Sequence, residues 1–70
     1  MTLTEFFEAL QNPANFVVSI TETDNGADKI LAKIYADGYA QLLAATLART
    51  VDKITVNSGK DITVHLAASL

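Results

Sequence analysis

The chain has 70 residues, half of them hydrophobic and 19% charged, which suits one small domain over residues 1–70 and leaves no room for two. It contains no cysteine and one histidine, so disulfides, thiolate metal sites and thiol nucleophiles are excluded. Five basic against eight acidic residues give a formal charge of −3, the wrong sign for a general binder of nucleic acid. We expect a cytoplasmic protein with no membrane association, because no apolar run approaches ~18 residues and the first residues lack a basic start.

The first segment predicts a short helix over residues 2–11. Thr2 and Glu5 match a capping box, in which each side chain bonds the backbone N–H of the other, and apolar residues follow at helical spacing. Asn12 and Pro13 should end the helix, because the residue before a proline is disfavoured in the α region.

A hairpin is predicted next. Residues 16–22 are rich in β-branched side chains, and residues 29–36 supply the returning strand across a three-residue loop at 25–27. This loop imposes three cross-strand pairs: Val18 with Ile34, Ile20 with Ala32, and Glu22 with Ile30. One long helix over residues 27–50 is the alternative, because the apolar positions also fit a 3.6-residue period.

Residues 37–51 predict a second helix with Asp37 as its N-cap, because alanine and leucine dominate the segment. A broad stripe should face the sheet: Ala40, Leu43, Ala44, Leu47, Ala48 and Val51. The remaining surface is still more apolar than contact with one sheet requires. Two interpretations follow: the helix is wedged between the sheet and the N-terminal helix, or its flank is a protein interface, which closes on a second copy as a dimer with Tyr39 as its anchor. The predicted interface residues are Tyr39, Leu42, Ala45 and Thr46.

Residues 52–66 alternate clearly and predict a second hairpin with a three-residue loop at 58–60. The expected pairs are Val56 with Ile62, Ile54 with Val64, Thr55 with Thr63, and Lys53 with His65. The four apolar members of these pairs should be buried, with Leu43 and Leu47 packed against them, and residues 67–70 should form a loose tail.

The predicted fold is α+β, in the order α-β-β-α-β-β, with a mostly antiparallel sheet and two helices on one of its faces; the long-helix alternative changes the order to α-β-α-β-β. The opposite face of the sheet collects basic and aromatic side chains that could meet an acidic partner: Lys29, Lys33, Tyr35, Lys53 and His65.

No nucleotide, metal or cofactor motif is present, so we expect no cofactor and no enzymatic activity. The leading hypothesis is a small protein-binding module, such as a regulator, inhibitor or accessory subunit, that also associates with itself. A nucleic-acid-binding protein that uses the lysine-bearing face is the first alternative, and a structural assembly subunit is the second.

Overall fold

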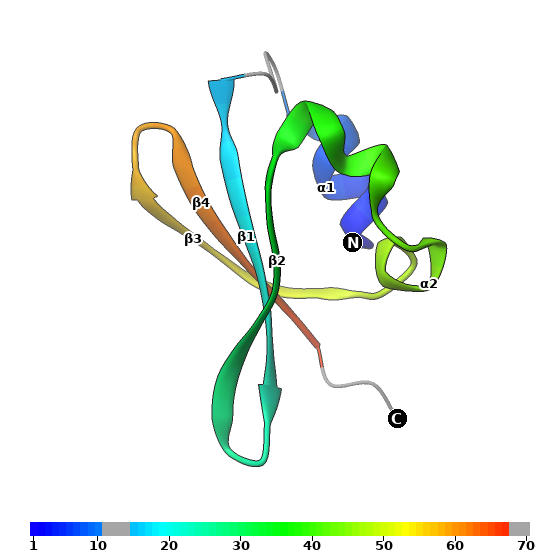
Figure 1. Ribbon diagram of the computed structural model, residues 1–70, viewed down its shortest axis with the longest axis vertical. Helices are drawn as coiled ribbons and strands as arrows, with labels where there is room; N and C mark the ends of the chain where they lie inside the picture. Colours follow the sequence, from blue (N-terminus) through cyan, green and yellow to red (C-terminus); the bar gives the residue numbers. More distant parts are fainter. Residues whose placement is uncertain (11–14, 68–70) are drawn as a thin grey trace.

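Four strands form one sheet in the order β2-β1-β4-β3, and all the helices lie on one side of it (Figure 1). The computed structural model describes residues 1–10 and 15–67. The elements are α1 (Leu3–Ala9), β1 (Val17–Asp24), β2 (Ala27–Tyr35), the 3-10 helix η2 (Ala36–Gln41), α2 (Ala44–Leu47), β3 (Val51–Ser58) and β4 (Asp61–Leu66). The two central strands, β1 and β4, are parallel, and the two outer pairs are antiparallel. The α+β class and the mostly antiparallel sheet are thus confirmed.

Helix α1 begins as predicted, with Thr2 as its N-cap. The backbone N–H of Glu5 donates to the Thr2 hydroxyl at 3.2 Å, and the backbone N–H of Thr2 donates to the Glu5 carboxylate at 2.8 Å. The hydrogen bond from the Thr2 backbone N–H to the Glu5 carboxylate is the largest influence that lowers the pKa of this carboxyl from its ordinary value, and the Thr2 side chain adds a smaller one. The predicted stop at Asn12 and Pro13 lies outside the described residues.

The first hairpin is confirmed, and the single helix over residues 27–50 is wrong. The loop has two residues rather than three, because Asn25 and Gly26 both take positive φ angles (53° and 82°), the geometry of a tight turn that matches strand twist. Two of the expected pairs, Val18 with Ile34 and Ile20 with Ala32, are present. Because the loop is one residue shorter than expected, β2 has one extra residue, Leu31, which forms a bulge and has no partner in β1. Glu22 therefore pairs with Lys29 instead of Ile30.

The second hairpin has all four predicted pairs. Its turn again has two residues, because Ser58 pairs with Asp61 and Asn57 forms a bulge. The alternation of apolar and polar residues in the two strands therefore predicts the strand pairs correctly, although the predicted loop length is one residue too long.

The predicted helix over residues 37–51 is wrong. Its first part is η2, its middle is the four-residue α2, and its last residue begins β3. Leu42 and Leu43 have extended backbones between the two helical pieces. Asp37 lies inside η2 rather than at its N-cap, and the start of η2 is tied to the residue before β1, because the Ala36 N–H donates to the Phe16 carbonyl at 2.9 Å. Packing onto the sheet thus overrides the helix propensity of this alanine-rich segment.

The core lies between the helices and the two central strands. Its buried members are Leu3, Phe6, Phe7, Val18, Ile20, Ala36, Ile62, Val64 and Leu66. Ile62 and Val64 are buried as predicted, and Leu47 packs against this cluster. Three expectations are wrong: Ile54, Val56 and Leu43 are 45%, 66% and 75% exposed. Ile54 and Val56 do share a face with Val64 and Ile62, but β3 is an edge strand, and the helices cover the centre of the sheet instead.

Candidate interaction surfaces

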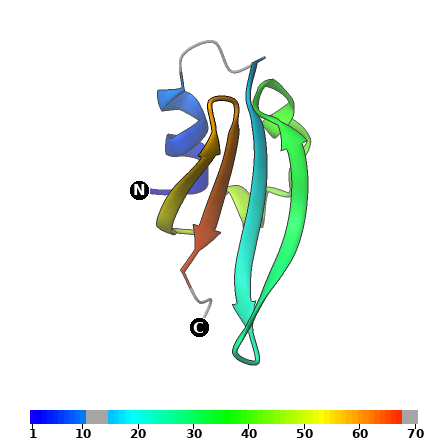
Figure 2. The ribbon, with the colours of Figure 1, turned by 90° about the vertical axis from the view of Figure 1, so that its left-hand side faces the viewer.

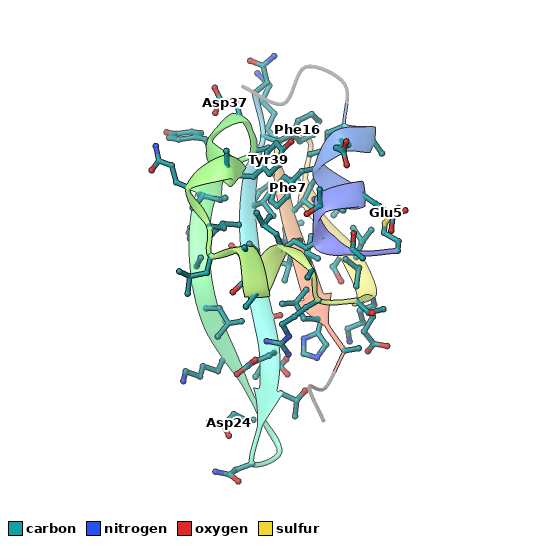
Figure 3. All side chains as sticks on the ribbon, turned by 90° about the vertical axis from the view of Figure 1, so that its right-hand side faces the viewer. Glu5, Phe7, Phe16, Asp24, Asp37 and Tyr39 are labelled. Carbon is teal, nitrogen blue, oxygen red and sulfur yellow. The ribbon has the colours of Figure 1, made fainter. Side chains whose placement is uncertain are left out.

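The predicted interface on the second helix does not form one exposed patch. Tyr39 is half-buried, and its ring stacks on that of Phe7 with centroids 4.8 Å apart and an interplanar angle of 6° (Figure 3). Leu42 also packs against the core, whereas Thr46 is half-buried and Ala45 is exposed. Tyr39 therefore joins η2 to α1 within one chain, and Leu42 packs on the core of the same chain.

The outer face, defined as the side of the sheet away from the helices, carries most of the predicted basic group. Across the sheet from β2 to β3, its three central rows are Tyr35, Val17, Asp61 and Ser58; Lys33, Ser19, Thr63 and Thr55; and Ile30, Thr21, His65 and Lys53. The bulge at Leu31 turns Lys29 to the other face, where it lies opposite Glu22.

Charge on the outer face is close to balanced. Lys33 and Lys53 lie on the two edge strands, which are three strand spacings or about 14 Å apart, and the two residues are in different rows. Asp61 and Asp28 share the face with them, because Asp28 pairs with Thr23 of the same outward set. Two lysines separated in this way and accompanied by two carboxylates make a weak electrostatic attractor for phosphates.

His65 is held between two strands by hydroxyl groups. The Thr21 hydroxyl lies 2.9 Å from Nδ1 of His65, and the Thr23 hydroxyl lies 3.1 Å from Nε2. The Thr23 hydroxyl donates to the Asp28 carboxylate at 3.4 Å, so it accepts from an Nε2–H, and Nδ1 accepts from Thr21. Both ring nitrogens are thus engaged within the chain, which favours a structural role that links β1 to β4. The described residues also contain no group of three or more side chains suited to a metal ion.

Arg49 ties together three distant parts of the chain. Its guanidinium forms an ion pair with Glu22 of β1 and donates to the Ala67 carbonyl at 3.0 Å, just after β4. Its own carbonyl accepts the backbone N–H of Leu3 at 2.9 Å, at the start of α1. Sequence reasoning did not single out Arg49, because its partners come from segments whose proximity depends on the parallel pairing of β1 with β4.

Strand β3 combines an edge position in the sheet with two exposed aliphatic side chains, Ile54 and Val56. Figure 2 shows the four strands side by side, with β3 in gold at one edge and β2 in green at the other. The first residues of β3 are covered by the chain itself, because the Val51 N–H donates to the Met1 carbonyl at 2.8 Å and Thr2 bridges to Thr50. Within the described part of the chain, residues 52–58 pair with β4 alone. We call these residues the β3 edge.

Two branched aliphatic side chains project from the β3 edge toward the side that carries the helices. Ile54 lies opposite Val64 and Val56 lies opposite Ile62, so each extends a row of core residues beyond the helical cover. The bulges at Asp52 and Asn57 bound a regularly paired stretch, residues 53–56, which is apolar on one face. Sequence alternation identified this face correctly, but it did not show that β3 would be at the edge.

The opposite edge of the sheet is better protected. Strand β2 exposes Ile30 to 65% and Tyr35 to the same extent, but its bulge at Leu31 falls in the middle of the strand. Lys29 and Lys33 flank that bulge. A central bulge and flanking lysines are the features by which proteins discourage pairing at an edge strand, so β3 is the more available of the two edges.

No protein-family model, curated protein or solved structure gives a significant match to this chain. In the described ranges, no helix is long and apolar enough to cross a bilayer.

Proposed function

We propose that this protein is a small, non-enzymatic protein-binding module that receives an extended segment of another chain at the β3 edge. The observation that carries the proposal is the combination, among residues 1–10 and 15–67, of β3-edge backbone groups that pair with no second strand and the exposed side chains of Ile54 and Val56. In strand addition, main-chain hydrogen bonds provide affinity, and contacts with alternate side chains provide specificity.

Neither an unpaired strand edge nor an exposed aliphatic pair is favourable in isolation. An exposed strand edge is a template for pairing, which proteins commonly block with charge, proline or a central bulge. The stretch from Ile54 to Val56 has none of these, although Lys53 adjoins it. An added strand would form hydrogen bonds with the free backbone groups. It would also bury apolar surface, which stabilises the complex by about 25 cal/mol for each Å² removed from water.

The nucleic-acid alternative has less support. The outer face brings Lys33, Tyr35, Lys53 and His65 to one side, but Asp28 and Asp61 offset the two lysines. Lys29, the third lysine of the predicted group, belongs to the other side of the sheet.

A display library of random linear peptides, selected against the immobilised protein, tests the proposal. We expect selected peptides to carry apolar residues at alternate positions, and to perturb backbone amide signals of the β3 edge in an NMR titration. Val56→Lys should abolish their binding, whereas Ile30→Lys should leave it unchanged. The two side chains are 66% and 65% exposed, so the pair is matched in exposure and in the charge introduced. Peptides whose binding survives Val56→Lys, or which perturb only the outer face, would refute the proposed function.

A further inference from the structure

We infer that the strand received at the β3 edge is the β3 edge of a second copy, paired antiparallel about a two-fold axis that passes through Thr55. This inference rests on the proposed function and names the partner. A two-fold axis perpendicular to a continuous sheet keeps the helices of both copies on the same side of that sheet. Each residue of one β3 must therefore lie opposite a residue of the other β3 whose side chain points to the same side of the sheet.

The extent of the free edge fixes where the axis falls. The chain's own Met1 and Thr2 occupy Thr50 and Val51, so a second strand cannot slide in that direction. The uncovered residues run from 52 to 58, and Thr55 is their midpoint. An axis at Thr55 therefore centres the pairing on the free edge of both copies.

Side-chain chemistry selects the same register. With the axis at Thr55, Ile54 of each copy lies opposite Val56 of the other, and Lys53 lies opposite Asn57. A shift of the axis to Ile54 would place Val56 opposite Asp52, and a shift to Lys53 would place two lysines opposite each other. A shift to Val56 would leave Ile54 opposite Ser58. Only the Thr55 register gives both apolar side chains an apolar partner.

The pairing also continues the existing core. Within one chain, Val56 lies opposite Ile62 and Ile54 lies opposite Val64, which are both buried. In the dimer, the row Ile62–Val56 of one copy would run directly into the row Ile54–Val64 of the other. The two aliphatic side chains that each chain exposes on its helix-bearing side would thus be covered by their own counterparts. Because bulges limit straight pairing to about three residues, the dimer should be weak and populated at high micromolar concentration.

Single-cysteine variants test the register. The chain has no cysteine, so Thr55→Cys and Ser58→Cys each introduce one thiol. Directly opposed residues of an antiparallel pair have Cα atoms about 4.5–5.5 Å apart, within the range of a disulfide. Two copies of residue 58 would instead lie six residues apart along the strand, at about 20 Å. Under mild oxidation, Thr55→Cys should form a covalent dimer at least tenfold faster than Ser58→Cys. Equal rates, or a faster Ser58→Cys, would overturn the register.

Sedimentation of cysteine-free variants tests the interface itself. Wild type and Ile30→Lys should self-associate to the same degree, and Val56→Lys should be monomeric at the highest concentration. If wild type is monomeric and Thr55→Cys does not crosslink, while selected peptides still bind the β3 edge, the second copy is refuted and the proposed function stands. If those peptides also fail to bind there, both are refuted. Association that is lost in Ile30→Lys and kept in Val56→Lys would assign the interface to β2.

Discussion

The stacked rings of Phe7 and Tyr39 should stabilise the fold of a single chain. Phe7 is 2% exposed and also meets the Phe6 ring edge-on, with centroids 5.3 Å apart. Replacing Phe7 or Tyr39 by leucine keeps apolar volume but removes the stack, so each change should cost about 1–1.5 kcal/mol of unfolding free energy. The stacking itself contributes about 0.5–1.5 kcal/mol beyond area burial. The double variant should therefore be less destabilised than the sum of the single variants, by about that amount.

The magnitude is measurable, because a domain of this length has roughly 4–10 kcal/mol of stability. Urea unfolding followed by circular dichroism gives the four free energies of the cycle, at a dilution where wild type is monomeric. A coupling below about 0.3 kcal/mol, the level at which independent sites add, would refute the contact. If Tyr39→Leu destabilised the protein only at high concentration, Tyr39 would instead belong to an interface between chains, as the sequence analysis predicted.

Three further changes test other features. Arg49→Met should lower the free energy of unfolding in urea by about 1–3 kcal/mol, because it leaves the half-buried Glu22 carboxylate and the Ala67 carbonyl without their charged donor. Arg49→Lys should restore part of this loss. An Arg49→Met variant as stable as wild type would contradict the role of Arg49 in joining these segments. Gly26→Ala should lower the free energy of unfolding by about 1 kcal/mol, because residue 26 has a φ angle of +82°. Gly59→Ala is the control and should not be destabilising, and at neither site would an added Cβ have an atom within 4 Å. Equal effects at the two sites would contradict the turn geometry. Folding lowers the pKa of Glu5, so its carboxylate stabilises the fold above pH 4.5 and loses that contribution as the pH falls through the folded-state value. The stability gap between wild type and Glu5→Gln, whose amide oxygen can still accept from the Thr2 N–H but carries no charge, should therefore narrow as the pH falls below 4.5, and a gap that does not change with pH would contradict the capping box.

The sequence by itself determined the local structure that depends on neighbours in the chain. The capping box at Thr2 and Glu5 forms as its spacing predicts, because both bonds close within one turn. Both hairpins form, and from the bulge at Leu31 to the end of β2, and throughout β1, β3 and β4, the faces are those that alternation indicates, because a slip of one residue would place the apolar set in water. Before that bulge, Lys29 and Ile30 lie on the faces opposite to those expected. The loop lengths were wrong because a bulge can absorb one residue without changing the pairing on its far side.

Only the tertiary structure decided the fate of residues 37–51 and the order of the strands. The apolar period of that segment is typical of a helix, but Tyr39 and Leu42 gain more from packing on α1 and the sheet than from continued helical hydrogen bonds. Alternation likewise gave Ile54 and Val56 the correct face of β3 without showing whether anything covers it. That depends on β4 pairing with β1, a parallel contact between segments about 40 residues apart, which leaves β3 at the edge. A pattern of period two records which side of a sheet a residue occupies, whereas its burial depends on which elements lie above that side.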